Sequence, residues 1–203
     1  MKYVKTFENH NNSTLIIVDV QKSFKKFFTD MYINELKKYC KNFKNVFQIW
    51  DNHIDGKNVD KDYLYDKKPD IPVHNDLYTF PNQVELIEKR YNYDVDANFY
   101  KKILSKNIYN DVKKKEDNKE LKKGNYFPTK EGTIIVYIGN NHKWFHSPIK
   151  LYKILEKLKG QEIVLVGGAD SECLEDVVTT CESLGVKIKR DHKYIYSASH
   201  CPI

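Results

Sequence analysis

Two continuous runs of apolar residues constrain the fold of this chain most strongly. The first is TLIIVDV at 14–20 and the second is EIVLVGG at 162–168. A strand that is buried on both faces shows an unbroken apolar run of this kind, and such strands belong mostly to parallel sheets. Parallel neighbours need a long crossover connection, usually a helix, so the rest of the chain should supply helices between strands.

Four further strands and four helices are predicted around these two runs. The strands are expected at 45–51, 83–89, 132–139 and 186–190. The helices are expected at 33–43, 98–112, 147–160 and 173–185. Strands that alternate with helices predict an α/β fold, a doubly wound and mostly parallel sheet with helices on both faces. We expect the whole chain, 1–203, to form a single domain of three layers.

The composition allows a packed core and excludes several classes of protein. Hydrophobic residues make up 40% of the 203 residues, and no apolar run approaches the ~20 residues of a membrane span. The net charge is +6, but the lysines at 112–123 are interleaved with acids. That pattern is typical of a solvated helix or loop, so a nucleic-acid partner is not expected. Four cysteines without a CxxC pair, after a polar first segment, predict reduced thiols and a cytoplasmic location.

Ionisable side chains follow the predicted strands at the edge where such sheets bind ligands. Asp19, Asp51, Lys89 and Cys173 each stand at the carboxyl end of a predicted strand or just beyond it. In open α/β sheets, ligands bind in the crevice outside the carboxyl ends of the strands. The coincidence predicts a functional site at this edge.

Cys173 begins a predicted helix, which favours a nucleophile. The helix dipole and the free N–H groups of a first turn stabilise a thiolate. The alternative is a packing role, since free cysteine is among the most buried residue types. Cys40 and Cys181 lie on apolar helical faces and are predicted to be core residues.

Four motifs resemble those of the isochorismatase-like cysteine hydrolases, and most closely the nicotinamidases within that family. They are IIVDVQKSF at 16–24, WDNH at 50–53 with PVH at 72–74, IEKRYNYDVDANF at 87–99 and VGGADSECLEDV at 166–177. The resemblance spans about 14–99 and 147–197. Each motif is weak alone, but the four occur in the family's order and at the predicted strand ends.

The resemblance implies a catalytic triad and an oxyanion hole. Cys173 matches the nucleophile, Asp19 the general base and acid, and Lys89 the lysine of the triad. The strand that Lys89 follows is expected to lie beside the first strand. The backbone N–H groups of Ala169 and Cys173 would form the oxyanion hole, next to a cis peptide between Gly168 and Ala169. Oxyanion donors of this kind are worth about 3 kcal/mol each.

The implied reaction is hydrolysis of a small amide through a thioester. Nicotinamide, converted to nicotinate and ammonia for NAD salvage, is the expected substrate, and Phe24 is expected to line its binding slot. The sequence also allows a homo-oligomer.

A divalent metal site is expected at Asp51, His53 and His74. The D-x-H spacing directs two side chains to the same side of a strand, because strand side chains alternate with a period of two. A carboxylate with two imidazoles suits Zn²⁺, Fe²⁺ or Mn²⁺. The resemblance implies that the ion holds the ring nitrogen of the substrate. The alternative is that these three are solvated loop residues.

The chain departs from the family pattern at several pocket positions, which leaves the substrate open to other small amides. The departures are Lys22, Ile71, Asn75 and Asp170. An insertion is expected at about 100–146. It contains Lys143 as a rival for the catalytic lysine, but Phe145 follows Lys143 too closely for the motif, so Lys89 is preferred. The alternative function is a non-catalytic scaffold of this fold, with the basic insertion binding a protein or nucleic-acid partner.

Overall fold

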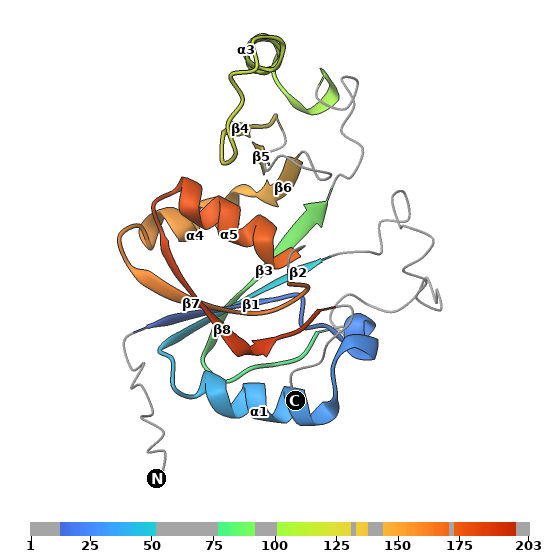
Figure 1. Cartoon of the computed structure of the whole chain (residues 1–203), viewed down its shortest axis with the longest axis vertical. Coiled ribbons are helices and arrows are strands. Elements are labelled where there is room, and N and C mark those ends of the chain that lie inside the picture. The colour runs from blue at the N-terminus through green and yellow to red at the C-terminus, as the bar shows by residue number, and fades with distance from the viewer. Residues whose placement is uncertain are drawn as a thin grey trace.

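The computed structural model of this chain describes residues 13–51, 77–91, 101–130, 133–137, 144–170 and 173–197. Its eight strands form one sheet in the order β4-β5-β6-β3-β2-β1-β7-β8 (Figure 1). The strands are β1 Thr14–Val18, β2 Asn45–Asp51, β3 Gln83–Tyr91, β4 Tyr126–Pro128, β5 Thr133–Tyr137, β6 Trp144–Pro148, β7 Glu162–Gly167 and β8 Lys187–Ile195. The helices are the 3₁₀ helix η1 Lys22–Phe27 and the α-helices α1 Asp30–Cys40, α3 Lys106–Asp117, α4 Ile149–Lys157 and α5 Cys173–Ser183.

Five neighbouring strands, β3, β2, β1, β7 and β8, run parallel to one another. From β1 the chain builds outward to β2 and β3 on one side, and later to β7 and β8 on the other. Helix α1 covers one face of this block, and α4 and α5 cover the other (Figure 1). The prediction of an α/β fold with a mostly parallel sheet and helices on both faces is confirmed.

The unbroken apolar run of β1 is explained by burial on both faces. Leu15 and Ile17 pack into a cluster with α1, whereas Ile16 and Val18 pack into a cluster with α4 and α5. All four side chains are fully buried. Strand β7 repeats this alternation, because Val164 and Val166 face α1 while Ile163 and Leu165 face the other side. Because side chains alternate along a strand, each of these two strands contributes residues to both hydrophobic clusters.

The starts of two helices, α1 and α4, differ from the prediction. Helix α1 begins earlier than expected because the Thr29 side chain accepts a hydrogen bond from the backbone N–H of Tyr32, at 3.1 Å. Ser147 and Pro148 were expected to start a helix, but they are the last residues of β6, where they pair with Ile134 and Thr133. Strand pairing with β5 competes with the capping signal there, and α4 starts only at Ile149.

The residues of the predicted insertion add an antiparallel extension beyond β3. Strand β6 pairs antiparallel with β3 and with β5, and β5 pairs antiparallel with β4. The strand expected at 132–139 is thus not part of the parallel block. The helix expected at 98–112 is replaced by α3, for which Ser105 is the N-cap. The extension has its own small core, formed by Ile103, Leu104, Val112, Phe127 and Ile135.

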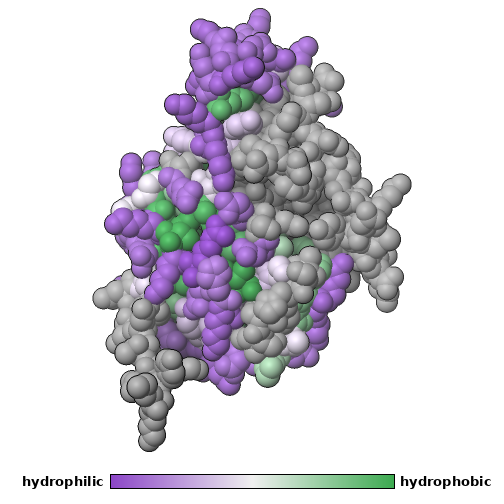
Figure 2. Space-filling view, in the orientation of Figure 1, coloured by the Kyte–Doolittle hydropathy of each residue, from purple (hydrophilic) through white to green (hydrophobic). Residues whose placement is uncertain are grey.

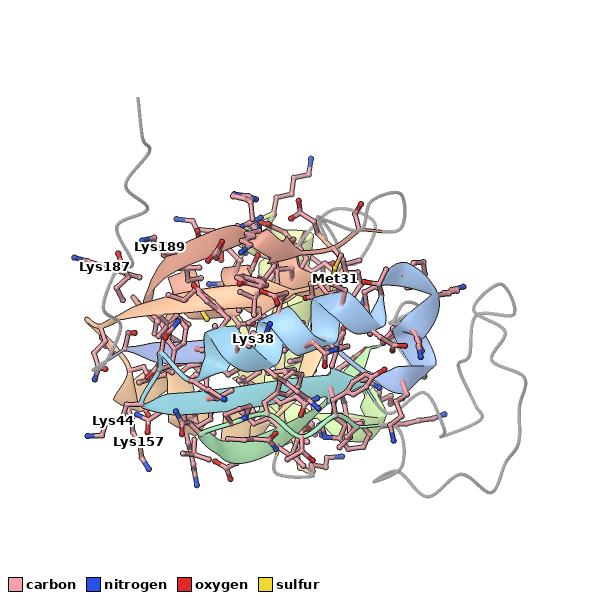
Figure 3. All side chains as sticks on the ribbon, turned by 90° about the horizontal axis from the view of Figure 1, so that it is seen from below. Met31, Lys38, Lys44, Lys157, Lys187 and Lys189 are labelled. Atoms are coloured by element: carbon pink, nitrogen blue, oxygen red, sulfur yellow. The ribbon has the colours of Figure 1, made fainter. Side chains whose placement is uncertain are left out.

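Two surfaces of the described residues are rich in polar or positively charged side chains. Val112 is the one buried residue of α3, whose outer surface is hydrophilic (Figure 2). Exposed lysines Lys44, Lys157 and Lys187 precede β2, end α4 and begin β8, so they gather at the amino edge of the sheet (Figure 3). Among the described residues, no helix has the length and apolar character needed to cross a membrane.

The buried thiols of Cys40 and Cys181 confirm their prediction as core residues and give the stability of the fold a pH dependence. Both are fully buried, and burial raises the pKa of each from 9.0 to about 12. The folded state therefore keeps the thiol protonated where the unfolded chain ionises, so stability is full below pH 9 and falls as the pH rises toward 12.

We expect the free energy of unfolding to fall between pH 8 and pH 10.5, with Cys181 contributing about 1–2 kcal/mol of the decrease. Urea unfolding at the two pH values measures this. The control is Cys181→Ala, which is less stable at both pH values but should show a smaller decrease between them. An equal decrease in the two proteins would contradict the assignment.

Candidate functional site

The carboxyl edge between β1 and β7 is the point where the strand order of the parallel block reverses. Strand β1 has β2 on one side and β7 on the other, and Val18 is in register with Gly167. Such a switch point opens a crevice that binds ligands in doubly wound sheets. The residue that directly follows β1 is Asp19. Gly168, Ala169 and Asp170 follow β7, in the turn that precedes Cys173 at the start of α5.

Asp19 is a buried acid with an unusual backbone conformation. Its exposed fraction is 1% and its φ angle is 53°, in the left-handed region. Its N–H donates to the carbonyl of Ile49 at 2.9 Å, and its carbonyl accepts from the N–H of Gln21 at 3.1 Å and from the hydroxyl of Tyr196 at 2.6 Å. A left-handed non-glycine residue that its surroundings hold in place is typical of functional sites.

The turn between β7 and α5 carries the predicted nucleophile and oxyanion hole. The peptide bond between Gly168 and Ala169 is cis, as the resemblance implies. The N–H of Leu174 donates to the carbonyl of Ala169 at 3.2 Å, which closes the turn around the two predicted oxyanion donors, Ala169 and Cys173. Cys173 is the first residue of α5, and its thiol is partly buried and not in a disulfide.

The two glycines of this turn allow the strand ends to approach each other. A Cβ atom on Gly167 would overlap with the carbonyl oxygen of Val18, and Gly167 has a φ angle of 101°. A Cβ atom on Gly168 would overlap with the ring of Tyr196. Gly167 is therefore required by the close approach of β7 to the end of β1, and Gly168 by the packing of the Tyr196 ring.

The position of Lys89 differs in two ways from the sequence prediction. Lys89 was expected to end a strand that lies beside the first one. Strand β3 lies instead beside β2, and it continues to Tyr91 because Arg90 and Tyr91 pair with β6. Two strand spacings, about 10 Å, separate its backbone from that of β1. The side chain of Lys89 lies outside the described part of the structure.

Topology separates Lys89 from its rival. Lys89 is in register with Asp51 on parallel strands that end at the candidate site. Strand β5, which precedes Lys143, is separated from β3 by β6, with which it pairs antiparallel. Of these two strands, β3 is the one that belongs to the parallel block. Lys143 lies outside the described residues.

The predicted metal ligands are only partly placed. Asp51 is the last residue of β2 and stands at the same carboxyl edge as Asp19. His53 and His74 lie outside the described residues, as does the side chain of Asp51. Among the residues that are described, no group of three His, Cys, Asp or Glu side chains could hold a metal ion.

Phe24, the predicted wall of the substrate slot, lies on η1 directly after Asp19 and Gln21. Its exposed fraction is 7%, and it packs in the α1 cluster with its ring centroid 6.3 Å from that of Phe27. The side chain is thus close in sequence to the site and largely covered by the core. The role of Phe24 at the slot stays a prediction.

A network of ion pairs connects β8 to the turn before Cys173 and to the first turn of α5. Arg190 contacts Asp170 at 3.4 Å and Glu175 at 2.5 Å, and Lys123 of the extension contacts Glu175 at 3.1 Å. Burial favours the neutral acid, but hydrogen bonds from Arg190 and Lys123 outweigh it and lower the pKa of Glu175. Asp170 is thus a partner of Arg190 in this network.

Three residues near the site were missed by sequence reasoning. Gln48 is fully buried on β2 and its amide donates to the carbonyl of Val20 at 3.1 Å, which supports the segment after Asp19. A glutamine inside the apolar run NVFQIWD was a usable signal. Tyr196 and Arg190 gave no signal, because their contacts arise only when β8 pairs with β7.

Comparison with protein-family models, with curated proteins and with solved structures finds no match to this chain.

Proposed function

We propose that this chain is a cysteine-dependent amide hydrolase with an isochorismatase-like fold. One observation carries the proposal. A buried acid, Asp19, follows β1 at the switch point of the parallel sheet, and the turn that leads to Cys173 follows the neighbouring strand β7. A cysteine that had only a packing role would not require the strained acid and the two obligatory glycines beside it.

The chemistry of the chain's own residues follows from this arrangement. Asp19 accepts the proton of the Cys173 thiol, and the thiolate attacks the amide carbonyl carbon. The N–H groups of Ala169 and Cys173 stabilise the oxyanion that forms. When the C–N bond breaks, Asp19 returns the proton to the leaving amine. Asp19 then takes a proton from the water that attacks the thioester carbonyl. When the C–S bond breaks, Asp19 returns this proton to the Cys173 sulfur and the acid leaves.

Two further parts of the proposal depend on residues whose side chains are not described. Lys89, on β3, would stabilise the thiolate of Cys173 through its positive charge. Asp51, with His53 and His74, would hold Zn²⁺, Fe²⁺ or Mn²⁺, which would fix a ring nitrogen of the substrate when bound. A metal ion that binds a ring nitrogen and a cysteine that attacks an amide would together suit a flat nitrogen heterocycle that carries an amide. Nicotinamide is therefore the proposed substrate. A cysteine nucleophile, which must be reduced to react, also fits the expected cytoplasmic location.

Ammonia release from nicotinamide is the direct test. We expect turnover by the purified chain, and at least about tenfold less with benzamide, which has the same amide but no ring nitrogen. Chelation with EDTA should abolish the preference for nicotinamide, and Zn²⁺, Fe²⁺ or Mn²⁺ should restore it. Hydrolysis of neither amide, nor of other small amides, would contradict the proposal and favour the non-catalytic scaffold.

A further inference from the structure

Tyr196 contacts both turns of the candidate site, the one at Asp19 after β1 and the one after β7 that leads to Cys173. It follows β8 directly, and its N–H donates to the carbonyl of Gly167 at 2.9 Å. Its own carbonyl accepts from the N–H of Asp170, also at 2.9 Å. Two backbone hydrogen bonds therefore tie Tyr196 to Gly167, at the end of β7, and to Asp170, in the turn that precedes Cys173.

The side chain of Tyr196 reaches the turn at Asp19, after β1. Its hydroxyl donates to the backbone carbonyl of Asp19 at 2.6 Å, a contact between residues 177 positions apart. The ring is 1% exposed and packs against Phe27 and Phe28, with centroid distances of 6.3 and 5.2 Å. On the remaining side, the missing side chain of Gly168 leaves room for the ring. The hydroxyl therefore has little freedom to move.

We propose that Tyr196 is a positioning residue that fixes the left-handed backbone of Asp19 relative to the turn that carries Cys173. The inference rests on the proposed function. The Tyr196 hydroxyl supports the Asp19 carbonyl, so losing it loosens the acid without touching the thiol or any substrate. A rotation of the Asp19 backbone would move its carboxylate away from the proton that it must accept.

The test uses Tyr196→Phe, which keeps the ring and removes only the hydroxyl. Tyr32→Phe is the matched control. The hydroxyl of Tyr32 is also buried, donates to a backbone carbonyl (that of Tyr194, at 2.8 Å) and belongs to the same aromatic cluster. That carbonyl belongs to β8 and to neither turn of the candidate site. Each variant leaves one buried carbonyl without this donor, so similar losses of thermal stability are expected.

Two measurements separate positioning from packing. For Tyr196→Phe we expect kcat to fall about tenfold with KM within about twofold, because a small misplacement of a catalytic group acts on the chemical step. The pH profile of Cys173 alkylation by iodoacetamide should move toward that of Asp19→Asn. Tyr32→Phe should keep the wild-type values of both.

Each contrary outcome has a distinct meaning. A Tyr196→Phe alkylation profile that coincides with the wild type, while Asp19→Asn differs, overturns the inference and leaves the proposed function standing. Equal effects of Tyr196→Phe and Tyr32→Phe overturn it in favour of general loosening of the cluster. An Asp19→Asn protein that matches the wild type in alkylation and hydrolysis removes the proposed function, and the role of Tyr196 with it.

Discussion

Replacement of Cys173 with alanine is expected to lower amide hydrolysis by at least about a thousandfold, and Asp19→Asn by a similar factor. Alanine removes the nucleophile. Asparagine keeps the size of the buried side chain but cannot accept the thiol proton. No other cysteine can substitute in the described part of the chain, because Cys40 and Cys181 are fully buried. Turnover of nicotinamide by the purified variants measures both effects.

The fold should survive both substitutions, so lost activity would not reflect unfolding. Cys173 is partly buried at the first position of α5, where removal of one sulfur leaves little unfilled space. Near-wild-type melting temperatures are therefore expected for Cys173→Ala, with Cys181→Ala as a control that loses stability but keeps activity.

Selective alkylation tests the same assignment independently. The thiols of Cys40 and Cys181, with pKa values raised to about 12 by burial, should not react with iodoacetamide at pH 8. Of the three described cysteines, Cys173 should be labelled first. A fully active Cys173→Ala protein, or faster labelling at Cys40 or Cys181, would remove the nucleophile assignment.

The parallel block could be predicted because its information is local. Strands β1 and β7 are dominated by apolar residues, and burial between two helical layers accounts for both runs. The acid at the end of β1 and the Gly-Gly-containing turn after β7 follow from the same runs. Both halves of the candidate site can therefore be recognised in the amino-acid sequence alone.

The extension and the support of the site could not be predicted in the same way. Strand β4 is only Tyr126–Pro128, and the residues of β6 resemble a helix start, so pairing partners decide their state. The contact of Tyr196 with Asp19 joins opposite ends of the chain and leaves no periodic trace in the sequence. The position of Lys89 depended on strand order, which periodicity does not report.

Gly167→Ala is expected to destabilise the fold by about 4 kcal/mol or more, for two additive reasons. The φ angle of Gly167 is 101°, where a side chain is strained in any surroundings. The new Cβ would also overlap with the carbonyl oxygen of Val18 and lie 2.8 Å from its nitrogen, and neither backbone atom can move without breaking the pairing of β1 with β7. Urea unfolding at a fixed pH gives the free energy of each variant.

Gly160→Ala isolates the first of these two reasons. Gly160 also has a left-handed backbone, with a φ angle of 80°, but no heavy atom lies within 4 Å of the position that its Cβ would take. The substitution should therefore cost only about 1 kcal/mol, from backbone strain alone. Equal costs at the two positions would mean that the ends of β1 and β7 can separate to admit a methyl group. In that case the close approach that brings Asp19 next to the turn of Cys173 would not be a fixed property of the fold. A much larger cost at Gly167 would instead show that this approach is held rigidly, as a pre-formed catalytic site requires.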